Sequence, residues 1–179
     1  MANNTRITLK NVRLSFPDLF KRATFEGVET KYGATLIISK EDKKAVAEIK
    51  EAIQALLSEN KATLPADKIC MKDGDLAVTD YNRGHYTINA SNNTRPVVVN
   101  RDRSPITDDD DIIYGGCYVN AIIDFWYLSR PTNRRICCNL HAVQFVKDGE
   151  RFGGVSVSAS EFDDISGDEV DDVYDDVPF

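Results

Sequence analysis

The 179-residue sequence lacks the long apolar runs that would place a chain in a membrane. No apolar stretch approaches the roughly 18 residues that a membrane-spanning helix needs. The first residues, MANNTRITLKN, also lack the apolar segment of a signal peptide. We therefore expect a protein that neither spans nor crosses a membrane.

Recognisable catalytic motifs are also missing. The sequence contains no G-x-S-x-G nucleophile elbow and no G-x-x-x-x-G-K-[ST] phosphate-binding loop. The four consecutive aspartates from Asp108 to Asp111 could suggest a metal site, but neighbouring side chains in an extended loop point to both sides instead of converging on an ion. We favour a solvated loop and predict no enzyme, no cofactor and no metal site, with a metal-dependent nuclease as an alternative.

The cysteines do not form a metal-binding or disulfide pattern. The sequence has four of them and no C-x-x-C pair: Cys70, Cys117, Cys137 and Cys138. Two are sequence neighbours, whose side chains in a strand would point to opposite faces. We therefore expect reduced, buried thiols in a cytosol, because a zinc site would need dispersed ligands such as His85 and His141.

Basic residues are missing from the end of the chain, which closes with DEVDDVYDDVPF. From Glu161 to Phe179 there are nine acidic residues and no Lys or Arg, whereas residues 1–160 carry 22 basic and 20 acidic residues. The overall net charge of −7 thus hides a mildly basic body, which could bind a polyanion. We expect one folded domain over residues 1–160 and a disordered acidic tail over residues 161–179.

The first predicted strand, residues 5–16, changes the face on which its apolar residues lie. Leu9 has one parity, whereas Val12, Leu14 and Phe16 share the other. A shift of one residue is what a β-bulge absorbs, so the pattern predicts one long, bent strand with a bulge near Lys10 and Asn11.

Four further principal strands and one helix follow. The strands are predicted over residues 31–39, 85–90, 112–128 and 135–146, with a shorter one at 96–99 and a bend at Gly115 and Gly116. Apolar residues at helical spacing predict a helix that is capped at Ser39 and ends near Ser58. This mainly β pattern with one helix favours an OB-fold-like small Greek-key barrel, although the usual OB helix follows the third strand and this one follows the second.

Basic and aromatic residues alternate in the predicted loops and strand ends, which favours nucleic-acid binding. Aromatic faces stack bases and Lys or Arg neutralise phosphates. In residues 112–128 the face of Phe125 is expected to be core and the face of Trp126 surface, where packing is the competing role. The candidate DNA-binding residues are Lys21, Arg22, Lys31, Tyr32, Tyr81, Arg83, His85, Tyr86, Arg95, Trp126, Arg130, Arg134 and Arg135.

Several ordered motifs resemble a known family. RLSFPDLF, KYGATLIISKED, GHYTINA, RPVVVNRDRSPI, YGGCYVNAIIDFW and AVQFVKDGERFGG are similar, in that order, to tailed-phage single-stranded-DNA-binding proteins with an OB-like fold. The resemblance covers most of residues 6–154. It implies a phage replication or recombination protein that coats single strands without catalysis, in the cytoplasm of the infected bacterial host.

The end of the chain resembles a second family. Bacterial single-stranded-DNA-binding proteins end in Asp-Asp-Asp-Ile-Pro-Phe, and the last five residues here are Asp175, Asp176, Val177, Pro178 and Phe179. In that family the tail docks replication and repair enzymes. Physically, Phe179 can fill an apolar pocket while the acids meet Arg or Lys of the partner. The acidic segment can also lie in the protein's own basic groove and compete with DNA.

The sequence thus predicts a non-sequence-specific single-stranded-DNA-binding protein that recruits partners through its C-terminus. The first alternative is a recombination mediator or strand-annealing protein, and a virion or scaffold protein is a further one. A homo-oligomer stays among the open alternatives.

Overall fold

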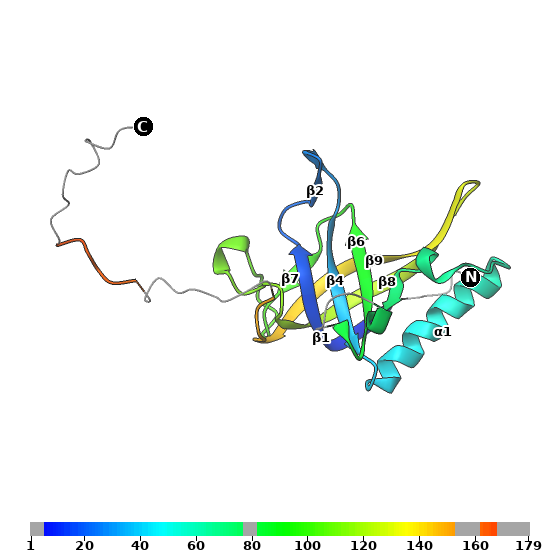
Figure 1. The fold of residues 1–179 in the computed structure, drawn as a ribbon, viewed down its shortest axis with the longest axis horizontal. Helices are drawn as coiled ribbons and strands as arrows, with labels where there is room; N and C mark the ends of the chain where they lie inside the picture. Colours follow the sequence, from blue (N-terminus) through cyan, green and yellow to red (C-terminus); the bar gives the residue numbers. More distant parts are fainter. Residues whose placement is uncertain (1–5, 77–81, 153–161, 168–179) are drawn as a thin grey trace.

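A closed five-stranded barrel forms the centre of the computed structural model, which describes residues 6–76, 82–152 and 162–167 (Figure 1). The barrel strands are β1 (Ile7–Asp18), β4 (Tyr32–Ser39), β6 (His85–Asn92), β8 (Tyr118–Arg130) and β9 (Asn133–Lys147). Antiparallel pairs link them in the order β6-β4-β1-β8-β9, and a parallel pairing of Ser91 with Asn139 closes the ring. This is the OB type of Greek-key barrel, so the predicted fold class is confirmed.

Short elements decorate the barrel. A hairpin of β2 (Thr24–Phe25) and β3 (Val28–Glu29) connects β1 to β4, β5 (Met71–Asp73) pairs with β6, and β7 (Val97–Val99) pairs with β9. Single 3₁₀ turns occur at Ala66–Lys68, Gly74–Leu76 and Asp108–Asp110. In Figure 1 the β2–β3 hairpin and the tip of the β8–β9 hairpin both project from the upper side of the barrel.

Two β-bulges bend β1. The first lies between Leu9 and Val12 opposite β8, as predicted. The second, between Ser15 and Asp18 opposite β4, was not predicted. The expectation that Phe16 shares a face with Val12 and Leu14 is wrong: those two are 3% and 0% exposed, whereas Phe16 is 72% exposed. The extra residue of the second bulge turns its side chain outward.

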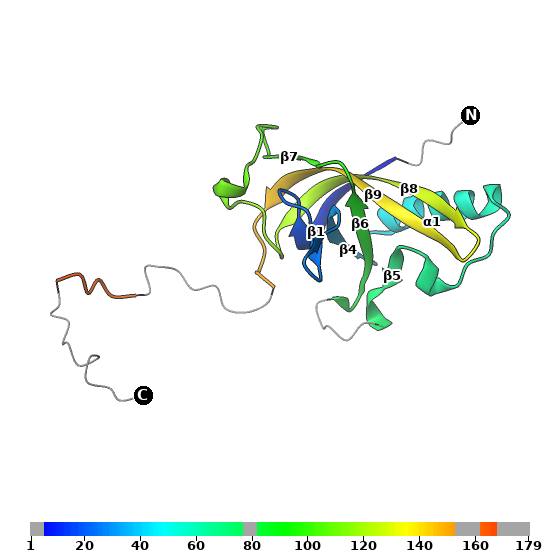
Figure 2. The ribbon, with the colours of Figure 1, turned by 90° about the horizontal axis from the view of Figure 1, so that it is seen from above.

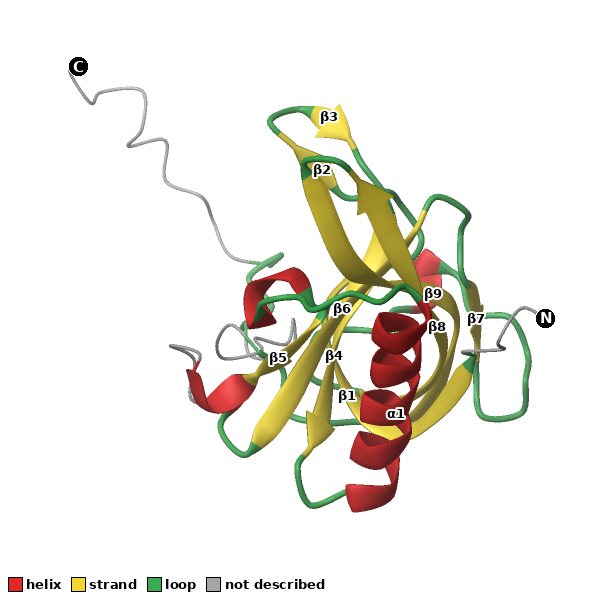
Figure 3. Ribbon diagram, turned by 90° about the vertical axis from the view of Figure 1, so that its right-hand side faces the viewer, coloured by secondary structure: helices red, strands yellow, loops and turns green. Residues whose placement is uncertain are grey.

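Helix α1 (Lys43–Glu59) lies between the second and third barrel strands, as the sequence indicated. Its cap is Asp42, whose Oδ1 accepts a hydrogen bond from the Ala45 N–H at 3.2 Å. The predicted cap at Ser39 is wrong, because its Oγ instead accepts from the Glu41 N–H within the preceding turn. Ile49 is buried where α1 packs against β1 and β8 (Figure 3). Within the described ranges, no helix is long and apolar enough to cross a membrane.

Alternation along β8 and β9 separates the core from the outer surface. Inward residues of β8 from Val119 to Phe125 are buried, whereas Trp126 is half-buried on the other face, as expected. The predicted strand over residues 112–128 begins too early, because the chain before Tyr118 turns at Gly116, which has φ +116°. Cys138 is buried and Cys137 half-buried, which agrees with their predicted opposite faces.

Candidate nucleic-acid interface

A first cleft of about 240 Å³ opens on the outside of the barrel. Four of its side chains are cationic, Asp67 is acidic, and Trp126 is aromatic. We call it the cysteine cleft because three thiol residues lie in its wall. It is lined by Lys31, Asp67, Lys68, Ile69, Cys70, Lys72, Asn89, Ser91, Trp126, Arg135, Ile136, Cys137, Cys138 and Asn139.

A second cleft of about 430 Å³ adjoins the first. We call it the Phe16 cleft. It is lined by Phe16, Asp18, Ala23, Thr30, Lys31, Tyr32, Gly33, Ala34, Thr35, Asn89, Ala90 and Ser91. Because Lys31, Asn89 and Ser91 belong to both clefts, the two form one open groove across the outside of β4, β6 and β9.

The groove lies where OB barrels offer their usual binding face. That face is formed by the second and third strands, with the loop between strands one and two and the loop between strands four and five at its sides. Here these elements are β4 and β6, the β2–β3 hairpin, and the tip of β8–β9 (Figure 2). Gly33 keeps β4 close to β6, because a Cβ there would lie 2.6 Å from the Ala90 carbonyl oxygen.

Arg22 fixes the Tyr32 ring at the edge of the groove. Its guanidinium donates hydrogen bonds to the carbonyl oxygens of Thr30 at 3.1 Å and Asn93 at 2.9 Å. The same group lies 5.1 Å from the centre of the Tyr32 ring, within cation–π range. Arg22 therefore positions the Tyr32 ring, and both of its terminal nitrogens already donate hydrogen bonds to backbone carbonyl oxygens.

Cations also surround the groove on the projecting segments. Arg130 and Arg134 are exposed at the tip of β8–β9, while the Arg135 Nε–H donates to the Asn133 Oδ1 at 3.0 Å. Lys21 is exposed in the connection after β1. Arg95 is exposed and stacks over the Phe20 ring, at 5.6 Å from its centre.

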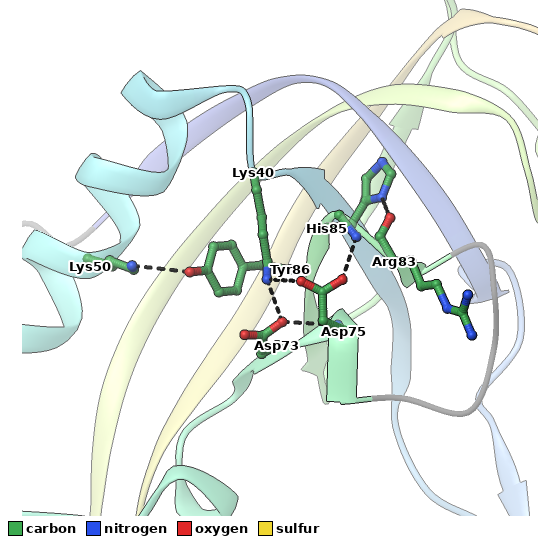
Figure 4. Close-up of polar contacts among 8 residues, drawn as sticks. Lys40, Lys50, Asp73, Asp75, Arg83, His85 and Tyr86 are labelled. Atoms are coloured by element: carbon green, nitrogen blue, oxygen red, sulfur yellow. Dashed lines mark hydrogen bonds and ion pairs between the residues drawn. The ribbon is translucent and has the colours of Figure 1, made fainter.

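The predicted residues Arg83, His85 and Tyr86 lie at the opposite end of β6. His85 pairs with Ser39 of β4 and Asn92 with Tyr32, so the two ends are seven residues apart, or roughly 23 Å along a strand. The imidazole Nδ1 of His85 lies 2.7 Å from the Arg83 carbonyl oxygen (Figure 4).

Tyr86 belongs to a network of charged residues, which we call the Tyr86 cluster: Lys40, Lys50, Asp73, Asp75 and Tyr86. The Lys40 ammonium lies 2.6 Å from a carboxylate oxygen of Asp73 and of Asp75 (Figure 4). The Lys50 ammonium donates to the Tyr86 hydroxyl at 3.2 Å. Both ammonium groups lie about 5 Å from the centre of the Tyr86 ring.

Hydrogen bonding shifts the pKa values of the charged groups in the Tyr86 cluster. The bond to Lys40 lowers the pKa of both Asp73 and Asp75 below the ordinary value of 3.8, and these bonds raise the pKa of Lys40 above its ordinary 10.5. Each charged form is thus stabilised by its partners.

The thiols in the cysteine cleft have unequal acidity. A hydrogen bond from the Cys138 thiol is the largest cause that lowers the pKa of Cys70, and the nearby charge of Lys72 acts in the same direction. Burial raises the pKa of Cys137 and of Cys138. Cys70 is therefore the most acidic of the three thiols in this wall.

The structure separates the predicted DNA-binding residues into three groups. Lys31, Tyr32, Trp126 and Arg135 line the groove; Lys21, Arg22, Arg95, Arg130 and Arg134 lie on the connections and hairpin tip described above; Arg83, His85 and Tyr86 lie at the far end of β6. Tyr81 and the predicted docking residues Asp175, Asp176, Val177, Pro178 and Phe179 lie outside the described residues.

Sequence reasoning missed several residues of the groove. These are Phe16, Lys68, Lys72, Asn89 and Ser91. The polar alternation of Asn89 and Ser91 with buried Ile88 and Ala90 could have placed them on an outer face. Pro17, inside a strand pattern, could have indicated the bulge that exposes its neighbour.

The four consecutive aspartates form a capped turn. The Asp110 carboxylate accepts a hydrogen bond from the Thr107 N–H at 2.8 Å, and all four side chains are exposed. Across the described ranges, no three His, Cys, Asp or Glu side chains converge as metal ligands would.

Fold and groove together define an OB-fold protein with a basic, aromatic-lined face over its second and third barrel strands. A sequence model described as the single-stranded-DNA-binding protein of Enterobacter phage Enc34 matches residues 5–174, so the chain belongs to this family. Protein p50 of Acyrthosiphon pisum secondary endosymbiont phage 1 is 36% identical over 174 residues, which are 90% of this chain and 94% of that protein.

Solved structures agree with this family. The single-stranded DNA-binding protein from bacteriophage Enc34 in complex with ssDNA is similar at a TM-score of 0.76 and 33% identity, over 84% of this chain and 91% of that chain. A second structure of the Enc34 protein gives a TM-score of 0.75 and 32% identity over 89% and 90% of the two chains. Bacteriophage T7 gp2.5, at a TM-score of 0.57 and 14% identity over 88% and 99%, shares the fold.

Proposed function

We propose that this protein binds single-stranded DNA without sequence preference in the groove formed by the cysteine and Phe16 clefts. The observation that carries the proposal is the lining of the groove, where Lys31, Lys68, Lys72 and Arg135 line the same cleft as the half-buried Trp126. Cations neutralise phosphates and an aromatic face stacks any base. Neither contact reads a base edge, so sequence preference should be weak.

Membership of the Enc34 family supports this proposal, because the Enc34 protein is a single-stranded-DNA-binding protein and one of its solved structures contains single-stranded DNA. By extension, the biological setting is phage DNA replication or recombination in the cytoplasm of the infected host. The protein would cover exposed single strands there and hold them for other enzymes.

Fluorescence offers a direct test, because Trp126 is the single tryptophan of the chain. Titration with oligo-dT at low salt should quench its emission, and an oligo-dA of equal length should bind with similar affinity. The log of the affinity should fall with log salt at ~0.7 per phosphate neutralised, or roughly 2 to 3 for four cations. Failure to bind either oligonucleotide, also after truncation following Ser160, would refute the proposal.

The C-terminal residues have a separate proposed role in partner recruitment. The support is chemical: an acidic segment that ends in Pro178 and Phe179 offers charge and one apolar anchor. A labelled peptide of residues 171–179 should bind a host enzyme that recognises the tail of the host's own single-stranded-DNA-binding protein. Replacement of Phe179 by Ala should abolish that binding, and equal binding of both peptides would contradict docking.

The same segment can also compete with DNA. Truncation after Ser160 removes nine acidic residues and no basic residue, so oligo-dT should bind more tightly to the shortened chain. Removal of Pro178 and Phe179 alone leaves the charge unchanged and should not alter DNA affinity. Equal affinity of the full and truncated chains would contradict competition and leave docking standing.

A further inference from the structure

We propose that Phe16 is a base-stacking residue, which the second bulge of β1 holds in the groove. This inference rests on the proposed function of single-stranded DNA binding and deepens it, because it adds a second stacking position beside Trp126. Phe16 combines a backbone with positive φ, an exposed ring and neighbours that line the Phe16 cleft.

The backbone of Phe16 is in a costly conformation. Its φ is +47°, in the left-handed region that bulky side chains rarely adopt. Among the described residues, the other non-glycine positions with positive φ are Asn11, Glu26, Lys61, Arg103 and Asp111, all polar or charged. Phe16 therefore stands out as an apolar side chain at such a position.

The Phe16 side chain contributes little to the stability of the fold. Phe16 is 72% exposed, so its ring buries little apolar surface in the core. An exposed aromatic ring on a strained backbone is unfavourable for folding on both counts. Strain of this kind persists at binding sites, where the surrounding structure fixes it.

The surroundings fix the bulge from both sides. Before it, the Leu14 N–H donates to the Cys117 carbonyl at 2.9 Å, and the Leu14 carbonyl accepts from the Gly116 N–H at 2.8 Å. The next residue, Ser15, is 2% exposed and pairs with β4. After it, Asp18 pairs with Gly33, and Leu19 is 1% exposed. With buried residues on either side, the chain between Ser15 and Asp18 is forced outward.

The position of Phe16 in the groove suits a stacked base. Its ring lines the same cleft as Tyr32, Thr35 and Asn89, which offer an aromatic face and hydrogen-bonding groups. Lys31 lies where this cleft meets the cysteine cleft, which contains Trp126. A single strand that follows the groove can therefore place one base on Trp126 and another on Phe16, with a phosphate between them near Lys31.

Three variants test the proposal with a labelled oligo-dT at low salt, measured by fluorescence anisotropy. Phe16→Asn removes the ring and places a residue that tolerates positive φ. Its Kd should rise roughly 5- to 150-fold, the range for one lost base stack. Phe16→Tyr keeps a stacking face and should stay within about twofold of wild type. Leu76→Asn is the matched control, because Leu76 is an apolar side chain that is 86% exposed and lines neither cleft, so its Kd should not change.

Thermal unfolding separates stacking from a structural role. If Phe16 serves only DNA, the Asn variant should melt at or above the wild-type temperature, because strain is relieved and little burial is lost. A lower melting temperature together with wild-type affinity would assign the ring to the fold and overturn the proposal. Equal loss of affinity in the Phe16→Asn and Leu76→Asn variants would also overturn the proposal.

Photo-cross-linking gives an independent readout on the wild-type chain. An oligonucleotide with 5-iodouracil should cross-link to the peptide that contains Phe16, since this chemistry favours stacked aromatic rings. Oligo-dT binding with cross-links only at Trp126 would overturn the Phe16 assignment and leave the proposed function standing. If wild type does not bind oligo-dT at all, both proposals fail.

Discussion

The groove and the Tyr86 cluster contain the same kinds of residue, but only the groove is open to a polyanion. In the groove, the described residues offer the Lys31 ammonium no ion pair or hydrogen bond. In the Tyr86 cluster, the Lys40 ammonium lies between Asp73 and Asp75 at 2.6 Å from each. Both sites contain lysine and aromatic residues, and they lie toward opposite ends of the same strand pair.

This difference shows that partner residues, and not residue types, decide which cations can meet phosphates. A phosphate at Lys40 would have to replace two carboxylates that are already bound. The Tyr86 ring is likewise occupied, because Lys40 and Lys50 lie against it. We therefore expect the groove to bind DNA and the Tyr86 cluster to stabilise the fold.

The largest expected effect comes from removing charge in the groove. The triple variant Lys31→Ala, Lys68→Ala and Arg135→Ala removes up to three phosphate contacts, which should weaken oligo-dT binding roughly 100-fold at about 0.1 M salt. The salt slope should fall by about 2 for the same reason. Titration at two or more salt concentrations measures both quantities.

A matched control removes three exposed cations outside the groove: Lys10, Lys43 and Lys44. This variant has the same net charge as the groove variant. If both lose affinity equally, the overall charge of the protein governs binding, and the contrast between the two regions fails.

The next effect compares the aromatic rings at the two sites. Trp126→Ala should raise the Kd for oligo-dT about tenfold, within the range for a lost base stack. Tyr86→Ala should leave the Kd unchanged and lower the melting temperature, because it removes the ring between Lys40 and Lys50. Anisotropy with labelled DNA suits both variants, since the first has no tryptophan. A higher Kd for Tyr86→Ala at unchanged stability would show that DNA binds at the His85 end of β6 and not in the groove.

The sequence predicted the barrel well, because its five long strands carry clear alternation. The short elements β2, β3 and β5 were missed, since two or three residues are too few for any periodic signal. Helix α1 was found from apolar spacing, but its first residue was misplaced because Ser39 and Asp42 are both good caps.

The candidate site was less predictable than the barrel, because it depends on contacts between residues that lie far apart in the sequence. Lys31, Trp126 and Arg135 meet only after β8 and β9 cross the barrel to reach β6, which no local pattern reveals. Tyr86 was an equally reasonable candidate from its sequence context. Its involvement with Lys40 and Lys50 depends on contacts across 36 or more positions of the chain.

A third prediction concerns the stability that the Tyr86 cluster provides. Lys40→Met removes the charge but keeps most of the apolar stem, and it should lower the free energy of unfolding at neutral pH without changing oligo-dT affinity. The effect should be modest, because the three charged side chains are partly exposed and water screens them. Urea unfolding of both proteins measures it.

The pH dependence of that difference follows from the lowered pKa of Asp73 and Asp75. A lowered carboxyl pKa contributes stability above the unfolded value, ordinarily 3.8, and that stability is lost as the pH falls through the folded pKa. The difference between wild type and Lys40→Met should thus be constant from about pH 5 to 8 and shrink below about pH 4. A difference that persists in acid would show that packing of the Lys40 stem, and not its charge, stabilises the cluster.

The smallest expected effect concerns the thiols in the wall of the groove. Cys70 should react with iodoacetamide faster than the other cysteines at neutral pH, because its lowered pKa leaves more of it as thiolate. Its rate should rise with pH and level off above that pKa. Saturating oligo-dT should slow the reaction several-fold if DNA covers the cysteine cleft, whereas Cys117, which is buried and lines neither cleft, should show no such protection. Peptide mass mapping over time measures all four rates.

The variant Cys138→Ala sharpens this last prediction. It removes the thiol that donates to Cys70, so the pKa of Cys70 should rise and its reaction at neutral pH should slow. DNA protection of Cys70 should remain, because protection depends on coverage of the groove and not on acidity. If the protection disappeared in Cys138→Ala, DNA would act on the acidity of the thiol pair without covering Cys70. That result would contradict a DNA strand that crosses the cysteine cleft.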